Sequence, residues 1–468
     1  MPTPVPPRRP LLRSLVGGSL LFPGIVSALA AEESRGSSVV DPLAAAAPQF
    51  PARAKRVIFL FMSGGVSHVE TWDPKPQLVA DAGKTLMVDE FQGRKGSFPM
   101  FLRPPQWKFA KHGASGTEVS ELFPHQAKCV DDLCVLRSVT SDHTNHYEAT
   151  LGMHTGSFSF ARPSLGAWVS YGLGTWNRNL PSFVVIAPHT PYAGGQVWGS
   201  DFLPGMHQGT LVVPGAEPVA NVRRRVASQR LQELELELLA RRNRRHLSER
   251  ADTLALAARL RSFETAFGMQ SELPGVFDLG EETAATHELY GLPPGSTAGF
   301  AWQCLVARRM IERGVRFVEL IDTGSSNNWD AHGDMQTHVP LARNVDRPIA
   351  GLLKDLKQRG LLEDTLVVWT SEFGRTPFNA AADARGREHH HWVFSSWLAG
   401  GGVKGGMTWG SSDEHGVRVA ENAVHVHDFH ATILHLLGID HERLTYRHSG
   451  RDFRLTDVHG HVVQEILA

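Results

Sequence analysis

Short apolar runs recur along the chain, separated by longer stretches with helical character. The run Arg56–Met62 ends in Ser63-Gly64-Gly65, which is typical of a buried parallel strand that opens into a turn. Similar runs occupy Leu133–Leu136, Phe183–Ile186, Val315–Ile321, Thr365–Trp369 and Ser396–Leu398. Helical stretches occupy Ala220–Phe267, Gly299–Arg313 and Pro340–Gly360. This alternation predicts an α/β fold with a central, mostly parallel sheet flanked by helices, in which ligands bind beyond the carboxyl ends of the strands.

The N-terminus has the organisation of an export signal. Arg8-Arg9-Pro10-Leu11-Leu12-Arg13 precedes an apolar run, and Ala28-Leu29-Ala30 follows it as an A-x-A cleavage site. The paired arginines resemble a twin-arginine signal; a general secretory signal or an uncleaved anchor are the alternatives. We therefore expect an export signal at 1–30, a linker at 31–53 and a single domain at 54–468. No later stretch is long and apolar enough to span a membrane, and we expect a periplasmic or extracellular protein.

Composition narrows the possible partners and points to a site. Lys+Arg total 47 and Asp+Glu 48, which argues against nucleic acid as a partner. The Arg-rich segment between Val222 and Arg250 is interleaved with glutamates, so we interpret it as a solvated helix face rather than a nucleic-acid patch. The 24 histidines are an excess, and histidine is the commonest metal ligand. Three scattered cysteines make neither a disulfide framework nor a cysteine zinc site.

Carboxylates and imidazoles gather at the ends of the predicted strands. They lie in Trp329-Asp330-Ala331-His332, in Ser371-Glu372-Phe373 and in Glu388-His389-His390-His391. We expect Asp330, His332, Glu372 and one histidine of the triplet to lie within a few ångströms of a common point. Such mixed ligands suit a divalent metal, with zinc favoured and manganese, calcium or magnesium as alternatives. The competing interpretation is that these are turn and cap residues.

Two further patches follow other predicted strands. Asp142-His143-Thr144-Asn145-His146 leads to His154-Thr155-Gly156, and we expect His146 and His154 to face the same cleft. The first turn, with Ser63, contributes His68 and Asp73 as further candidate metal ligands. Ser63-Gly64-Gly65 lacks both the dinucleotide fingerprint and the Walker lysine, so it gives no nucleotide signal.

Together these segments resemble a known family. The matching stretches include Met62-Ser63-Gly64-Gly65, Trp329-Asp330-Ala331-His332-Gly333, Ser371-Glu372-Phe373-Gly374-Arg375-Thr376, Gly386-Arg387-Glu388-His389-His390 and His427-Asp428-Phe429-His430. They are similar to the exported bacterial domain-of-unknown-function family 1501, which is abundant in planctomycetes and belongs to the alkaline-phosphatase/sulfatase superfamily. The resemblance extends from about residue 54 to the end of the chain.

The resemblance implies a hydrolase of phosphate or sulfate esters with one or two metals and a nucleophile at a helix start. By position, Asp330 and His332 resemble its Asp/His loop, Glu372 resembles the aspartate of a later pair, and His389 or His390 resembles its final histidine. Two departures matter: Ser63-Gly64-Gly65 stands where an aspartate is usual, and the sulfatase nucleophile motif is absent. His68 or Asp73 would replace the missing aspartate.

The resemblance also suggests catalytic residues, and Thr155 is one of the candidates. Nine residues before the Thr155-Gly156 pair, at the position of the sulfatase nucleophile, stands His146. It could attack phosphorus, bind metal or mark a site that has lost this activity. Arg375 or Arg387 would hold the anion through a planar guanidinium fork.

Three functions are compatible with these observations. The first is an exported, metal-dependent hydrolase of small-molecule or glycan phosphate or sulfate esters. The second is a non-catalytic protein that keeps a metal or anion site, for example to capture sulfated glycans. The third is metal-dependent hydrolysis or transfer on another substrate. Neither the substrate nor the oligomeric state follows from the sequence.

Overall fold

The apolar runs identified in the sequence form one central sheet. The computed structural model describes residue 41 and residues 43–222, 228–249 and 254–468, so the predicted export signal lies outside the described residues. Within them, nine strands pair in the order β15-β6-β14-β10-β1-β9-β7-β8, with β18 on β6. Their bounds are β1 (Arg56–Phe61), β6 (Leu133–Thr140), β7 (Phe183–Ile186), β8 (Thr210–Val212), β9 (Phe317–Ile321), β10 (Thr365–Thr370), β14 (Phe394–Ala399), β15 (Met407–Trp409) and β18 (Val424–His425).

The sheet is mostly parallel, as predicted. β1 pairs in parallel with β10 and β9, and the same sense continues through β7 to β8. β14 is the exception, because it runs antiparallel to both β10 and β6. The amino end of β14 therefore lies at the edge where β1, β9 and β10 have their carboxyl ends.

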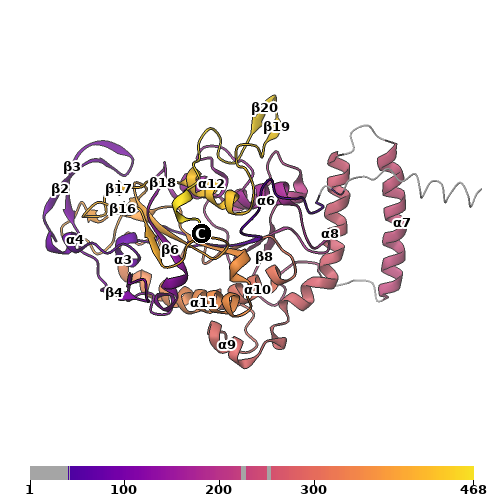
Figure 1. The fold of residues 1–468 in the computed structure, drawn as a ribbon, viewed down its shortest axis with the longest axis horizontal. Coiled ribbons are helices and arrows are strands. Elements are labelled where there is room, and N and C mark those ends of the chain that lie inside the picture. Colours follow the sequence, from indigo (N-terminus) through magenta and orange to yellow (C-terminus); the bar gives the residue numbers. More distant parts are fainter. Residues whose placement is uncertain (1–40, 42, 223–227, 250–253) are drawn as a thin grey trace, which may run out of the picture. The chain divides into compact units, whose positions relative to one another are not determined.

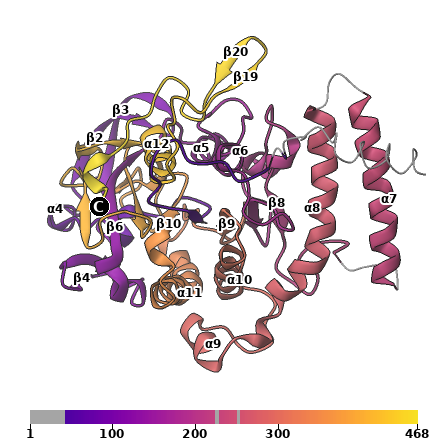
Figure 2. The ribbon, with the colours of Figure 1, turned by 45° about the vertical axis from the view of Figure 1, so that its right-hand side comes forward.

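Helices cover both faces of this sheet (Figures 1 and 2). The side chains of β1 alternate between the two faces. Ile58 and Leu60 join one apolar cluster, with α10 (Phe300–Glu312) and α11 (His338–Gln358). Val57 and Phe59 join the other cluster. That second cluster includes residues of α5 (His146–Thr155), α6 (Leu165–Leu173) and α12 (Val426–Leu436). A strand buried on both faces explains the continuous apolar run at this position.

Further helices and strands complete the described part of the chain. In its described residues, the segment expected as one helical stretch at 220–267 contains α7 (Gln229–Ser248) and the first part of α8 (Leu254–Phe277), which ends ten residues later than expected. The helices are α3 (His68–Thr71), α4 (Pro76–Ala80), α7 (Gln229–Ser248), α8 (Leu254–Phe277) and α9 (Ala284–Tyr290). The strands are β2 (Thr85–Phe91), β3 (Arg94–Leu102), β4 (Phe109–His112), β5 (Thr117–Ser120), β11 (Gly374–Arg375), β12 (Phe378–Asn379), β13 (His389–His390), β16 (Ser411–Ser412), β17 (Val419–Glu421), β19 (Tyr446–His448) and β20 (Arg451–Phe453).

Part of the expected linker is attached to the domain. Arg53 N–H donates to Leu436 O and Gln49 N–H to Gly438 O, while Thr175 N–H donates to Leu43 O. Residues 43–468 accordingly form one unit. Over the residues that the structure describes, no helix is both long and apolar enough to cross a membrane.

Candidate metal centre

Three strand-end loops are tied together at one edge of the sheet. Trp329 N–H donates to Ser63 O at 3.0 Å, which joins the loop after β9 to the loop after β1. Gly64 N–H donates to Glu372 Oε1 at 2.9 Å, which joins the loop after β10. Gly64 has φ +111°, and a Cβ there would lie 2.7 Å from the backbone nitrogens of Trp329 and Asp330. The turn therefore requires glycine, and its close approach fixes where Asp330 lies.

Four side chains converge at this edge. One ligand atom from each of His146, Asp330, His332 and His389 lies within 4.8 Å of the other three. His146 is the first residue of α5, whose N-cap Asn145 accepts a hydrogen bond from Tyr147 N–H. Asp330 and His332 follow β9, and His389 lies in β13, before the antiparallel strand β14. This set combines three imidazoles and one carboxylate, which suits Zn²⁺.

Each of the three histidines has its Nδ1 held by an acceptor. His146 Nδ1 lies 2.6 Å from Glu372 Oε1, and His389 Nδ1 lies 2.6 Å from Thr144 O. His332 Nδ1 lies 2.8 Å from Glu388 Oε2. Carboxylates and carbonyls only accept, so the proton of each ring sits on Nδ1 and leaves Nε2 for the centre. Metal-binding histidines have this outer-shell arrangement.

The three Nε2 atoms point towards one another. His332 Nε2 and His389 Nε2 lie 2.9 Å apart, and each also approaches Asp330 Oδ1, at 2.9 and 3.3 Å. His146 Nε2 is buried without a hydrogen bond and lies 3.3 Å from Asp330 Oδ2. Lone pairs this close repel unless a cation or a proton lies between them. The unsatisfied nitrogen of His146 and the nitrogen-rich donor set both fit a divalent metal bound by these four residues.

Without a metal, protons fill this role. Hydrogen bonds that His332 donates to Asp330 and then to Glu388 raise the pKa of His332 to about 9. Burial lowers the pKa of His146, but Asp330 and Glu372 outweigh it and the net shift is upward. Burial, followed by Arg375, lowers the pKa of His389, so this ring is neutral and ready to coordinate. A metal would therefore displace a proton from His332.

Arg375 holds Asp330 rather than facing solvent. Its Nη2 donates to Asp330 Oδ1 at 2.6 Å, and its other N–H groups donate to the carbonyls of Gly64, Gly65 and Arg387. The guanidinium is fully buried. Arg387 is similarly engaged, because it donates to Glu70 Oε1 and to the carbonyls of Thr376, Arg103 and Pro104. These contacts leave neither arginine placed as the expected anion clamp.

Glu372 takes a position that differs from the expected one. Glu372 is fully buried, and the His146 ring separates it from Asp330. It thus supports the cluster through His146 instead of contributing a ligand atom to it. The sequence left His146 open as nucleophile, ligand or remnant, and its Nε2 atom belongs to the candidate cluster. The expected meeting of Asp330, His332 and one triplet histidine does occur, at His389.

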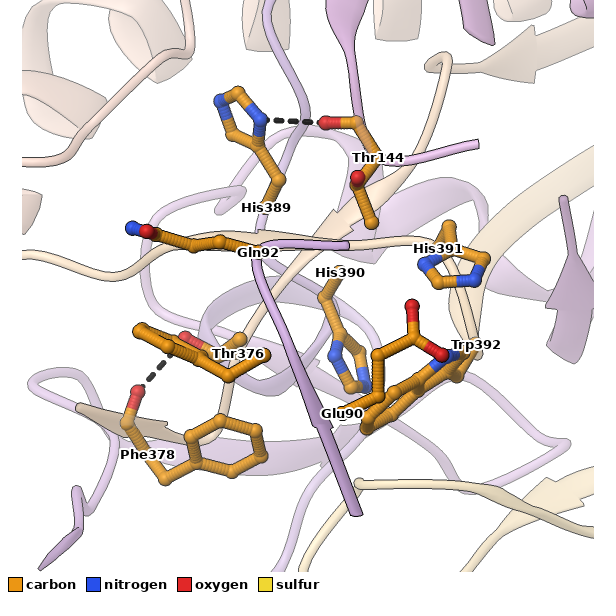
Figure 3. A pocket seen from close by; sticks show the side chains of 10 residues that line it. Glu90, Gln92, Thr144, Thr376, Phe378, His389, His390, His391 and Trp392 are labelled. Atoms are coloured by element: carbon orange, nitrogen blue, oxygen red, sulfur yellow. Dashed lines mark hydrogen bonds between the residues drawn. The ribbon is translucent and has the colours of Figure 1, made fainter. Parts of the chain in front are cut away.

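Three other expected ligands lie in a separate buried region. His390 stacks on His68 with ring centroids 5.6 Å apart, and His68 Nε2 bonds to Gly416 O. Asp73 pairs with Lys75 at 3.0 Å and accepts from Ser412. Consecutive residues of a strand point to opposite sides. His389 and His390 line a cavity of about 10 Å³, and their side chains point in opposite directions (Figure 3). Of the two, only His389 is turned towards Thr144.

Thr155 and His154 also lie away from the cluster. They end α5, roughly 12–14 Å along its axis from His146 at 1.5 Å per residue. Thr155 Oγ1 donates to Leu151 O. His154 is buried beside the sheet, with Nε2 2.7 Å from Glu319 Oε1. His154 therefore does not share a cleft with His146, although the sequence predicted that it would. Thr155, a candidate catalytic residue, also lies away from the cluster.

Sequence reasoning missed the outer contacts of the cluster. Glu388 and the carbonyl of Thr144 orient His332 and His389. Tyr192 stacks flat on His146, with centroids 4.2 Å apart. Glu388 stands beside His389 in the sequence and could have been noticed as a carboxylate. A backbone carbonyl and a stacking tyrosine from another segment leave no sequence signal.

The centre is open on one side. The side chain of His332 is 41% exposed and that of Asp330 is 25% exposed, whereas His146 and Glu372 are buried. A bound metal would thus be reached from the side of His332, where a further ligand could join it. Catalytic zinc sites keep such an open position.

Fold and cluster together define an α/β protein with a histidine-rich candidate metal centre at the carboxyl edge of its sheet. The chain matches the family described as "Protein of unknown function (DUF1501)" over residues 54–467, and it belongs to that family. The membership expected from the motifs is therefore confirmed. No curated protein matches the chain.

Several solved structures are similar to it at low identity. The lipoteichoic acid synthase LtaP from Listeria monocytogenes is 10% identical, with 90% of this chain and 80% of that chain covered and a TM-score of 0.36. The PsFucS1 sulfatase from Pseudoalteromonas sp. is 12% identical, with 83% and 69% covered and a TM-score of 0.35. The alkaline phosphatase from the Antarctic bacterium TAB5 is 11% identical, with 82% and 98% covered and a TM-score of 0.34.

Proposed function

We propose that this protein is a metal-dependent hydrolase whose metal is bound by His146, Asp330, His332 and His389. The observation that carries this proposal is the convergence of three Nε2 atoms on Asp330, with all three Nδ1 atoms held by acceptors. A divalent metal at such a site polarises an ester oxygen and lowers the pKa of a bound water. The class of substrate, phosphate or sulfate esters, is supported by the sequence resemblance described above.

The chain's own residues prepare the site. Glu372 and Glu388 keep His146 and His332 in the tautomer that presents Nε2. Burial alone raises the pKa of Asp330, but hydrogen bonding with His146, His332 and His389, and then the charge of Arg375, outweigh burial and lower this pKa, so the carboxylate stays ionised. Arg375 also donates to its Oδ1. Tyr192 packs against His146 and covers one side of the ring. Substrate would enter beside His332.

One observation favours a second function, a non-catalytic metal-binding protein. Arg375 and Arg387, the cations expected to hold an anionic ester, are both occupied by internal partners. A protein of this kind would keep the metal and bind a glycan or another exported partner without turnover.

Elemental analysis of the purified protein, combined with a panel of aryl phosphates and sulfates, distinguishes the two functions. Bound metal with turnover that disappears in Asp330→Asn supports the hydrolase. Bound metal without turnover on any ester of the panel supports the binding protein. Absence of metal after purification and reconstitution with zinc or manganese contradicts both.

We also propose that the protein is exported by the twin-arginine route and cleaved after Ala30. Arg8-Arg9 and Ala28-Leu29-Ala30 support this proposal. N-terminal sequencing of the secreted protein should give Ala31, whereas a full-length, membrane-retained product would show that the segment is an anchor.

A further inference from the structure

Helix α7 carries an apolar face that no described residue covers. Leu231, Leu234 and Leu238 are 50%, 45% and 62% exposed, and the adjacent Leu239 is 52% exposed. Their spacing of three and four residues places the first three on one side of the helix. The opposite side, with Leu236, Ala240 and Leu247, is less exposed and faces α8, to which Gln232 is hydrogen-bonded through Gln270. In Figures 1 and 2, α8 lies between α7 and the sheet.

Charge is divided along the same helix. Its first half contains Glu233, Glu235 and Glu237 with one arginine, Arg230, whereas its last third contains Arg241, Arg242, Arg244 and Arg245 with no acidic residue. Within the described part of the chain, Glu235, Arg242 and Arg244 form no ion pair. A partner of this helix needs basic residues opposite its acidic first half and acidic residues opposite its basic last part. A second copy of the same helix, running in the opposite direction, has this distribution of charge.

We propose that α7 pairs with α7 of a second copy in an antiparallel, two-fold symmetric dimer. With the axis between Leu238 and Leu239, Leu238 of one copy lies opposite Leu239 of the other. The same axis places Glu235 of each copy opposite Arg242 of the other, and both residues lie on the side of the helix that carries the exposed leucines. Apolar contact at the centre and opposite charges on either side are the arrangement that fixes orientation in helix pairs.

The proposal explains a pattern that a solvated helix would not need. A face in contact with water has no requirement for four exposed leucines, and exposed apolar patches mark interaction sites. The long stems of Arg241 and Arg245 would lie against Leu234 and Leu231 of the second copy, and the charged end of Arg245 would keep its ion pair with Glu249.

The first test is the mass of the full chain in solution. Light scattering across a concentration series should give twice the 51.4 kDa chain mass at high concentration. Leu238→Glu places two like charges at the axis and should raise the dimer dissociation constant more than about 100-fold. Val458→Glu, at a residue 72% exposed elsewhere on the domain, is the matched control and should leave the dimer intact. Circular dichroism confirms that each variant is folded.

The second test uses the charges. Glu235→Arg should be monomeric, and so should Arg242→Glu, because each variant places like charges opposite each other across the axis. Mixing the two variants should restore a dimer, because each then presents the charge that the other needs. A wild-type protein that stays monomeric overturns the proposal. This holds even if the leucine face of α7 binds anionic phospholipid vesicles, because the occupant would then be a membrane and not a second copy. A dimer that survives Leu238→Glu, or variants that fail to associate when mixed, also overturns it.

Discussion

At the scale of single residues, the position of a proton defines the candidate centre. Thr144 O, Glu372 and Glu388 each occupy the Nδ1 side of one histidine, so three rings offer the same atom to a shared point. The roles of neighbouring histidines in the triplet follow from this. His389 has such an acceptor, and His390 stacks on His68 in a separate buried region.

Replacing His389 and His391 one at a time distinguishes the candidate ligand from its neighbour in the sequence. His389→Ala should lower the affinity for zinc more than about 100-fold, since losing an outer-shell partner alone costs 10- to 100-fold. His391→Ala removes a half-buried imidazole two residues away that belongs to no ligand group and should keep the metal. Competition with a chromophoric chelator measures both affinities, and equal losses in the two variants would contradict the assignment.

Glu372 should behave as a positioning residue. Glu372→Gln keeps an oxygen that can accept from His146 Nδ1–H, so zinc affinity should fall by about tenfold and the metal should remain. Glu372→Ala should cost up to about 100-fold, and it leaves Gly64 N–H without its acceptor, which lowers the free energy of unfolding by about 1–3 kcal/mol. Complete metal loss in Glu372→Gln would instead show that Glu372 coordinates the metal.

The residues at strand ends could be predicted from the sequence, but their division into ligands and supports could not. Asp330, His332 and the histidine triplet follow from their places beside apolar runs. Whether Glu372 touches the metal depends on where the ring of His146 lies, and His146 is 226 positions away in the sequence. The same holds for Arg375. From the sequence its planar guanidinium is expected to bind an anion, but in the fold it donates hydrogen bonds to three backbone carbonyls.

At the scale of elements, one reversed strand makes the site possible. The apolar pattern predicts a mostly parallel sheet, and in such a sheet loops that precede a parallel strand lie at the opposite edge from loops that follow one. His389 precedes its strand, yet it meets Asp330, because β14 is antiparallel to β10. The expected convergence thus occurs for a reason that the apolar pattern does not contain, since strand direction has no signature in a short buried run.

Gly64 should be the most sensitive position among these loops. Gly64→Ala places a methyl group against the backbone of Trp329 and Asp330 at positive φ, so the loop carrying Asp330 must move. We expect a loss of metal and a decrease of at least about 2 kcal/mol in the free energy of unfolding. Gly83→Ala is the matched control, with positive φ (+78°) and no heavy atom within 4 Å. It should cost only the roughly 1 kcal/mol of backbone strain and retain the metal, and similar outcomes for both would refute the packing argument.

At the scale of the whole molecule, metal binding and stability should be linked. A ligand that binds only the folded state stabilises it by about 2.7 kcal/mol at a concentration 100 times its Kd. Adding a chelator to the metal-loaded protein should therefore lower Tm by a few degrees, and the shift should be absent in His389→Ala. A metal-loaded protein whose Tm does not respond to complete chelation would show that the metal is adventitious.

The buried pair of His154 and Glu319 should make stability depend on pH. Burial alone lowers the pKa of His154, but the Glu319 carboxylate outweighs burial and the net shift is upward. The folded state then binds this proton more tightly than the unfolded chain does. Its contribution is complete below pH about 6.5 and is lost as pH rises through the folded pKa.

Denaturant titrations of the wild type and Glu319→Gln between mildly acidic and alkaline pH test this dependence. Breaking the buried pair should cost about 3–5 kcal/mol at the acidic end, and the difference between the two proteins should shrink as pH rises. A difference that stays constant over the whole range would mean that His154 does not carry the proton.

The four candidate ligands are far apart along the chain, and this separation has a consequence for how the protein comes to hold its metal. From His146 to His389 the chain passes through β7, β9 and β10, so no continuous fragment shorter than about half of it contains the whole set. Closing loops this long is unfavourable until the sheet has formed. A nascent chain in which β13 has not yet been synthesised should therefore have no high-affinity zinc site. Metal loading would then be a late, all-or-none event that reports whether synthesis has passed residue 389.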